Sequence, residues 1–359
     1  MSNTTLIAAV HRLPSMTHSV LATMIRERLL DQDPNSITAA SLIALGIQAE
    51  RAYAVVTDLQ HLDLETTAAE LHRYHIHVVT INDTEYPFLL KQISSAPPVL
   101  YIRGSIETLH RTGLAVVGTR RPSPYGTSVL PTLLQPVFRA GIIVVSGLAL
   151  GIDGQAHRLA VQHHSPTVAV LGCGVDTIYP REHRQLADDI LATGGAIISE
   201  FPLNAEPERH HFPQRNRIIS GLTTATLLVE AGGKSGALIT AKFAVDQNRD
   251  VLSVPGPITS PQSVGPLNWL KLGATPITSA DDILRVFGAT TVEPSPVPTV
   301  YHPQNDVERT LLGALAHGPV HIDELAEKSR LDNSVVSATL TLLEISGVVR
   351  HHGGHLYSL

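Results

Sequence analysis

The stretch Ile143-Val-Val-Ser-Gly-Leu-Ala-Leu-Gly-Ile-Asp-Gly154 joins a strand-sized apolar run to a glycine-rich turn and the start of a helical pattern. Two other runs have the same form, Leu114-Ala-Val-Val-Gly-Thr-Arg120 and Val168-Ala-Val-Leu-Gly-Cys-Gly-Val-Asp176. Glycines at the carboxyl end of parallel strands let backbone N–H groups approach a phosphate, and the following helix start adds its dipole. The three runs predict an α/β sheet whose carboxyl edge binds a phosphate-rich ligand.

Strand-like runs alternate with helical patterns through residues 73–289, which is typical of a parallel, doubly wound, Rossmann-like sheet. We expect strands to begin at Ile76, Val99, Leu114, Ile142, Thr167, Ala196, Thr226 and Val251. We expect the intervening helices over residues 125–139, 152–162, 181–191, 218–222 and 237–247. This pattern makes the chain an α/β protein with one central sheet domain.

The segment before the sheet domain, residues 1–72, predicts a small helical domain. Its helical patterns are short and are separated by Asp, Pro and Gly; they cover residues 18–30, 35–45 and 50–59. The first twelve residues lack the basic start and the long apolar run of a secretion signal.

The segment after the sheet domain predicts a proline-rich linker over residues 290–304 and a winged helix over residues 305–359. Asn305 and Glu308 have the spacing of a helix cap, and a third helix is expected to end near Ile345 before a hairpin that turns at Gly353-Gly354. We expect this third helix to bury its apolar side chains, Val335, Val336, Leu340 and Leu343.

Composition limits the classes of function. The net charge of −6 and the pI near 6.3 argue against a protein that coats DNA by bulk charge. Residues 114–287 carry fourteen Lys and Arg against thirteen Asp and Glu, so a nucleic-acid site must be a local patch. The apolar stretches are too short to span a membrane, and the single cysteine fits a reducing compartment, so we expect a cytoplasmic protein.

The segment Phe212-Pro-Gln-Arg-Asn-Arg-Ile-Ile-Ser-Gly221 concentrates candidate binding groups. Guanidinium groups bind phosphate oxygens bidentately and stack on bases. We expect one of Arg215 and Arg217 to pair with Glu200 or Glu230 and the other to face a ligand. Asn216 could contact a base edge or cap the helix predicted to begin at Ile218, and Phe212 could stack on a base or pack in the core. Pro213 disfavours helix at Phe212.

Further candidates come from the loops that follow the predicted strands. Arg120 ends one strand and could bind a phosphate, or it could be a surface arginine beside a helix terminus. Gly118, Thr119, Ser146 and Gly147 could offer backbone N–H groups, although glycine there could equally serve tight packing. Gly233-Lys-Ser235 lacks the earlier glycine of a phosphate-binding loop, which leaves Lys234 and Ser235 as separate candidates.

No arrangement of residues typical of an enzyme or a metal site occurs in the sequence. There is no G-x-S-x-G turn, and the nineteen histidines have no H-E-x-x-H or Cys/His spacing. Gly172-Cys-Gly174 lacks the third glycine of a dinucleotide site. We therefore expect no catalysis, no cofactor and no metal.

The chain resembles the DNA-processing family known as DprA or Smf over roughly residues 75–287. The ordered motifs that carry this resemblance are Tyr86-Pro87, Val117-Gly-Thr-Arg120, Tyr125-Gly126, Ser146 to His157, Gly172 to Asp176, Tyr179-Pro180, Ser199 to Pro202, Phe212 to Leu222, Glu230-Ala231, Ser235 to Ala241, Val254 to Gly256, Asn268 and Gly273-Ala274. Two small departures are Thr119 in place of a usual serine and the insertion of Gly232-Gly-Lys234.

The resemblance implies a bacterial, homodimeric mediator of recombination in natural transformation, which binds and protects single-stranded DNA and loads the RecA recombinase. It also implies that the N-terminal helices are of the sterile-alpha-motif-like kind. The DNA-binding set we predict is Gly118, Thr119, Arg120, Ser146, Gly147, Phe212, Arg215, Asn216, Arg217, Lys234 and Ser235. The alternative is a nucleotide-hydrolysing enzyme similar to the phosphoribohydrolases, but Glu230 to Gly236 lacks the Pro, the Thr and the downstream acid of their loop.

Overall fold

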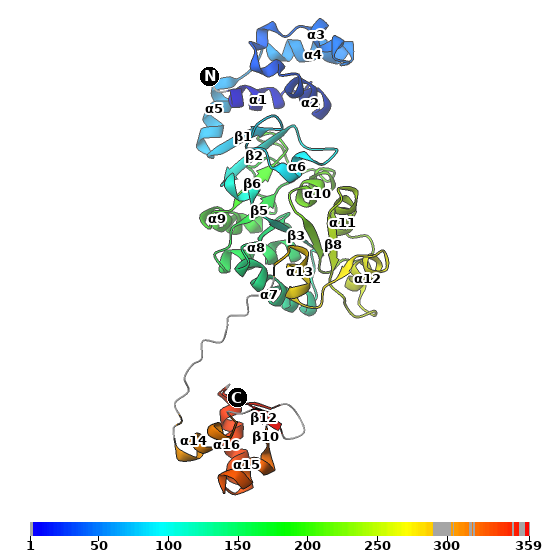
Figure 1. Ribbon diagram of the computed structural model, residues 1–359. Helices are drawn as coiled ribbons and strands as arrows, with labels where there is room; N and C mark the ends of the chain where they lie inside the picture. The colour runs from blue at the N-terminus through cyan, green and yellow to red at the C-terminus, as the bar shows by residue number, and fades with distance from the viewer. Residues whose placement is uncertain are drawn as a thin grey trace. The chain divides into compact units, whose positions relative to one another are not determined.

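A computed structural model describes residues 3–289, 303, 305–315, 318, 320–346, 348–351 and 356–358. The chain forms two compact units, Met1–Thr291 and Val292–Leu359 (Figure 1). Among the helices that are described, none combines the length and the apolarity needed to span a bilayer.

A nine-stranded sheet forms the centre of the first unit, with the strand order β1-β2-β6-β5-β4-β3-β7-β8-β9. Its strands are β1 Ile76–Thr80, β2 Val99–Gly104, β3 Gly113–Val117, β4 Ile143–Ser146, β5 Thr167–Val170, β6 Ala196–Ser199, β7 Ala225–Leu228, β8 Asp250–Ser253 and β9 Thr275–Pro276. All neighbours from β6 to β9 are parallel, and only β1 and β2 join antiparallel. The predicted α/β fold and all eight predicted strands are confirmed, whereas β9 was not predicted.

Helices cover both faces of the sheet, which is why the central strands are apolar on both sides. Leu114 and Val116 of β3 pack with α7, α8 and α13, while Ala115 and Val117 pack with α6, α10 and α11. The bounds are α6 Phe88–Lys91, α7 Pro124–Arg139, α8 Ile152–Gln162, α9 Arg184–Ala192, α10 His211–Gly221, α11 Ala237–Asp246, α12 Val264–Lys271 and α13 Ala280–Val286, with 3-10 turns at Glu107–His110, Arg181–His183 and Pro261–Ser263.

Helix α10 corrects one prediction. We expected a helix only from Ile218, with Asn216 as a possible cap, but the helix begins at His211. Pro213 falls in the first turn, where its missing N–H would have had no partner inside the helix. Asn216 therefore lies in the interior of the helix and does not cap it.

The N-terminal helices pack on the antiparallel edge of the sheet. They are α1 Asn3–His11, α2 His18–Arg26, α3 Ala39–Ala44, α4 Ala49–Leu59 and α5 Leu64–Arg73, with 3-10 turns at Leu29–Asp31 and Pro34–Ser36. Leu21 and Met24 share one buried cluster with Val78 and Tyr101 of strands β1 and β2. The three expected helical regions are present; the first two are shorter than expected, and the third spans Ala49–Leu59. Helices α1 and α5 were not predicted; the apolar periodicity of α1 is weak.

The described residues of the second unit form three helices and a small sheet of order β10-β12-β11. The elements are α14 Asp306–Leu315, β10 Val320–His321, α15 Ile322–Ser329, α16 Asn333–Ile345, β11 Arg350–His351 and β12 Leu356–Ser358. Asn305 Oδ1 accepts from the backbone N of Glu308 at 2.8 Å, as its capping position predicts.

Three of the four side chains expected in the core of α16 are buried, Val336, Leu340 and Leu343. The expectation for Val335 was wrong: it is 40% exposed because it lies on the outer side of the helix. The predicted linker at 290–304, apart from Pro303, and the turn at Gly353-Gly354 lie outside the described residues.

Candidate nucleic-acid interface

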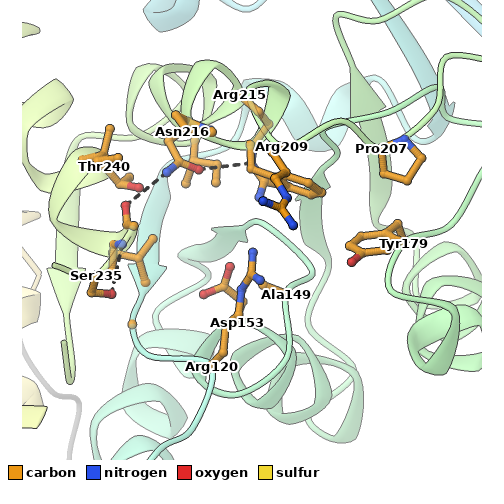
Figure 2. Close-up of a pocket in the computed structure, with 18 residues that line it drawn as sticks. Arg120, Ala149, Asp153, Tyr179, Pro207, Arg209, Arg215, Asn216, Ser235 and Thr240 are labelled. Atoms are coloured by element: carbon orange, nitrogen blue, oxygen red, sulfur yellow. Dashed lines mark hydrogen bonds between the residues drawn. The ribbon is translucent and has the colours of Figure 1, made fainter. Parts of the chain in front are cut away.

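A candidate site lies between β3 and β7, where the strand order of the sheet reverses direction. Strands β3 and β7 are neighbours, but the chain continues from β3 to β4 on one side and from β7 to β8 on the other. Ligands of open α/β sheets bind in the crevice at the carboxyl ends of such strands. A pocket of about 710 Å³ opens here. Figure 2 shows Asn216 and Ser235 on one side of it, Tyr179 and Pro207 on the other, and Arg120, Asp153, Arg209 and Arg215 between them.

The loop that carries Arg120 is fixed by its backbone. Thr119 donates its N–H to the carbonyl of Glu230 at 2.6 Å, and its own carbonyl accepts from the N–H of Ile152 at 3.2 Å. The Glu230 carboxylate accepts from the backbone N and the Oγ of Ser123 at 2.8 and 2.5 Å. Thr119 thus holds the loop, and Gly118 beside it lines the pocket.

Gly151, on the next loop, lets that loop pass close to Arg120. Its φ of +82° suits glycine, and a Cβ there would lie 2.7 Å from the Cα of Arg120. The Arg120 side chain itself is exposed, and its guanidinium has no hydrogen bond or ion pair to any described residue. It is therefore free to bind an anion.

The loop after β4 does not offer the amide that the sequence suggested. The N–H of Gly147 already donates to Asp153 Oδ2 at 3.2 Å, and the Oγ of buried Ser146 donates to the carbonyl of Val116 at 2.6 Å. A Cβ at Gly147 would lie 2.6 Å from Arg215 Nη2. Glycine here permits close packing of Arg215, the alternative that the sequence left open.

Two opposite charges that line the pocket are largely buried, Asp153 and Arg215. Burial raises the pKa of Asp153 to about 6, while Arg215 opposes that rise. Burial lowers the pKa of Arg215 to about 10, so it remains charged at neutral pH. Arg215 Nη1 donates to the carbonyls of Gly147 and Val170, and only 4% of the residue is exposed. Arg215 therefore acts on the pocket mainly through its field, which the neighbouring Asp153 carboxylate offsets in part.

Arg217 is the arginine that forms the expected structural pair. Its Nη1 and Nη2 donate to the two oxygens of Glu200 at 2.5 and 2.6 Å, and its Nε donates to the carbonyl of Ser95 at 3.0 Å. Both partners are buried. Because Arg215 and Arg217 are two residues apart on a helix, their side chains diverge, and Arg217 does not line the pocket.

Phe212 lies at the mouth of the pocket. Its ring is 5.5 Å from that of Tyr179, and the Cζ atoms of Arg120 and Arg215 lie 5.9 and 6.0 Å from its centroid. A smaller cavity of about 50 Å³ lies among these side chains, and Gly147 also lines it. The Phe212 ring is partly exposed, so it could stack on a base. A ring packed in the core could not.

Polar groups on the opposite side come from α10 and from the loop after β7. Asn216 donates from Nδ2 to the carbonyl of Gly236 at 3.3 Å and accepts from Arg215 Nε at 3.2 Å. Ser235 lines the pocket, while Lys234 is exposed on the same loop but does not line it.

Several residues that line the pocket were not in the predicted set, among them the polar side chains Asp153, Tyr179 and Arg209. Tyr179 and Asp153 belong to motifs that carried the family resemblance, and that was a usable signal. Arg209 precedes α10, and nothing local in the sequence marked it. Its guanidinium also lacks a hydrogen bond or ion pair within the part of the chain that is described.

The comparisons with known proteins agree with this geometry. The model of the DNA recombination-mediator protein A family matches residues 77–288, which include both strands of the switch point. The chain belongs to this family. A DprA winged helix domain model matches residues 292–355.

Members of the family resemble the chain along most of their length. Protein Smf of Escherichia coli K12 is 38% identical over 290 residues, covering 79% of this chain and 78% of that protein. DNA processing protein DprA of Bacillus subtilis is 38% identical over 257 residues, covering 70% of this chain and 86% of that protein.

Two solved structures of family members are also similar. DprA of Streptococcus pneumoniae superposes with a TM-score of 0.70 at 29% identity, covering 79% of this chain and 98% of the other. DNA processing protein A of Helicobacter pylori, described by its single-stranded DNA binding mode, gives a TM-score of 0.54 at 27% identity, covering 60% of this chain and 97% of the other.

Proposed function

We propose that the pocket at the switch point binds the sugar–phosphate backbone of single-stranded DNA. The observation that carries this proposal is the free guanidinium of Arg120, held by an ordered loop at the edge of a 710 Å³ pocket. Arg209 and Lys234 supply two more cations without partners among the described residues. The binding described for the Helicobacter pylori relative supports the same ligand.

The chemistry of the pocket suits a single strand. Arg120 and Arg209 would contact phosphates, and buried Arg215 would add positive charge that Asp153 offsets in part. Phe212 and Tyr179 would receive an unpaired base, a contact worth about 1–3 kcal/mol per base in proteins that bind single strands. A duplex hides the faces of its bases, so stacking favours the single strand.

We propose further that the protein acts as a homodimeric, cytoplasmic mediator that protects single-stranded DNA and transfers it to RecA during natural transformation, without a chemical step. The support is family membership. The decisive test is RecA filament formation on DNA covered by single-stranded-DNA-binding protein, where adding this protein should accelerate filament growth. An unchanged rate would contradict the mediator role.

A competition gel shift tests the ligand class. We expect unlabelled single strands to displace a labelled single strand, and duplexes or mononucleotides to do so only at much higher concentration. If mononucleotides compete best and the protein releases free base from them, the nucleotide-hydrolysing alternative replaces the proposal. Asp153, an acid that lines the pocket, would then be the first residue to substitute.

Affinity for single-stranded DNA should fall with salt. Contacts from Arg120, Arg209 and Lys234 would neutralise about three phosphates, and each contributes ~0.7 to the slope for single strands. We therefore expect log K against log salt to have a slope near −2, measured by fluorescence titration. A flat response would contradict a phosphate-binding pocket.

Deleting residues 291–359 should change the affinity for single-stranded DNA by no more than a few-fold at neutral pH. The winged-helix segment carries more acid than base, and α16 contains no Lys or Arg, which disfavours contact with phosphates. We propose that it contacts another protein instead. A loss of tenfold or more, about 1.4 kcal/mol, would move the DNA site into that segment.

A further inference from the structure

Three side chains of kinds that bind metals, Glu208, His210 and His211, meet at the start of α10 and just before it. None of them lines the pocket. Glu208 Oε2 lies 3.4 Å from His210 Nδ1. A ring nitrogen of His211 lies within 4.8 Å of the ligand atoms of both. A backbone turn gathers them, because the N–H of His211 donates to the carbonyl of Glu208 at 3.1 Å.

His211 provides an independent indication of a ligand. Its Nδ1 is buried and has no hydrogen-bond partner in the described part of the molecule. Buried polar atoms are rarely left without a partner, because this costs about 1–3 kcal/mol. The ring cannot easily turn away, since it stacks on Phe201 with centroids 3.9 Å apart and contacts His210 edge-on at 4.4 Å.

The spacing fits a small transition-metal ion. Zinc bonds to imidazole nitrogen and carboxylate oxygen are about 2.0–2.2 Å long, so two ligands of a tetrahedral site lie about 3.4 Å apart. The Glu208–His210 distance has this value, and the ligand atom of His211 lies within 4.8 Å of both. Calcium and magnesium prefer sites built entirely from oxygen, which excludes them from a set with two imidazoles.

We propose that Glu208, His210 and His211 bind a divalent ion of the zinc class, with water in the fourth position. Arg209, which lines the DNA pocket, lies between two of these ligands. A bound ion would tie down the backbone on both sides of Arg209 and add positive charge close to the pocket. The expectation of no metal site rested on named motifs, and Glu-x-His-His is not one of them.

The experiment is a titration of the full-length protein with Zn²⁺ against a chromogenic chelator, without DNA. The double variant Glu208→Gln/His210→Ala removes two exposed ligands, so its fold should survive, as circular dichroism can verify. Removing one residue that hydrogen-bonds a metal ligand typically weakens metal binding about 10–100-fold. Removing two ligands should weaken it further. We expect the variant to bind one equivalent of Zn²⁺ fewer than the wild type over the same range of free Zn²⁺ concentration.

The matched control is His163→Gln/His164→Asn, an exposed pair of adjacent histidines that no carboxylate accompanies among the described ion pairs. It should bind Zn²⁺ like the wild type. Replacing Zn²⁺ by Co²⁺ should give visible absorption bands that the Glu208→Gln/His210→Ala variant lacks. Equal stoichiometry and equal Co²⁺ spectra in the wild type and that variant would overturn the site, whatever the outcome of the DNA experiments.

Discussion

Replacing Arg217 by alanine is expected to lower the free energy of unfolding by about 3–5 kcal/mol, the usual effect of removing one partner from a buried ion pair. The Glu200 carboxylate would lose both of its bonds to the guanidinium and remain buried. The carbonyl of Ser95 would lose its donor as well. Urea denaturation followed by circular dichroism measures the change.

The double variant Glu200→Leu/Arg217→Met separates stability from binding. It removes both charges and fills the space with apolar groups, so it should recover much of the lost stability. Protein that remains folded should bind single-stranded DNA as the wild type does, because Arg217 does not line the pocket. If Arg217→Ala kept the stability of the wild type but lost affinity for DNA, Arg217 would be a DNA-binding residue after all.

Replacing Arg120 by alanine should give the opposite result, a large loss of DNA affinity with little loss of stability. A hydrogen bond to a charged group contributes about 1.5–3 kcal/mol, which corresponds to a roughly tenfold to hundredfold weaker complex. The side chain is exposed and has no polar partner among the described residues, so the fold does not depend on it. Fluorescence anisotropy at matched salt gives the affinity.

Arg139→Ala is the matched control for this substitution. Arg139 is an exposed arginine at the last position of α7, whereas Arg120 precedes the first turn of the same helix. The sixteen residues of the helix span about 24 Å, and Arg139 lies at the end far from the loop of Arg120. Both variants lose one positive charge, so an equal effect on affinity would show that net charge, and not the pocket, controls binding.

The strands of the sheet could be predicted because each is a short apolar run that ends in a turn. The direction of a strand is not a local property, and so the antiparallel entry of β1 and β2 was missed. Strand β9 contains only two residues, too few for any periodicity. The start of α10 was misplaced because we expected Pro213 to disfavour helix at Phe212. Proline is tolerated in the first turn of a helix, and Pro213 lies in the first turn of α10.

The site was predicted in outline because parallel strands end at one edge of the sheet. Arg120, Phe212 and Arg215 were expected together at this edge, and all three line the pocket. The sequence does not show that the Asp153 carboxylate accepts a hydrogen bond from the N–H of Gly147, because this bond depends on how α8 is placed relative to the loop. Nor could it separate Arg215 from Arg217, which have the same chemistry but opposite surroundings.

The carboxylate of Glu230, at the end of β7, holds the loop that follows β3. This loop is therefore ordered before any ligand arrives, and binding does not have to freeze its backbone, which otherwise costs about 1–2 kcal/mol per residue. A single strand of DNA is flexible, so at this loop the loss of conformational freedom on binding would fall mainly on the nucleic acid. Glu230 thus keeps this loop of the protein rigid in the proposed complex, and the single-stranded DNA adapts its conformation to the loop.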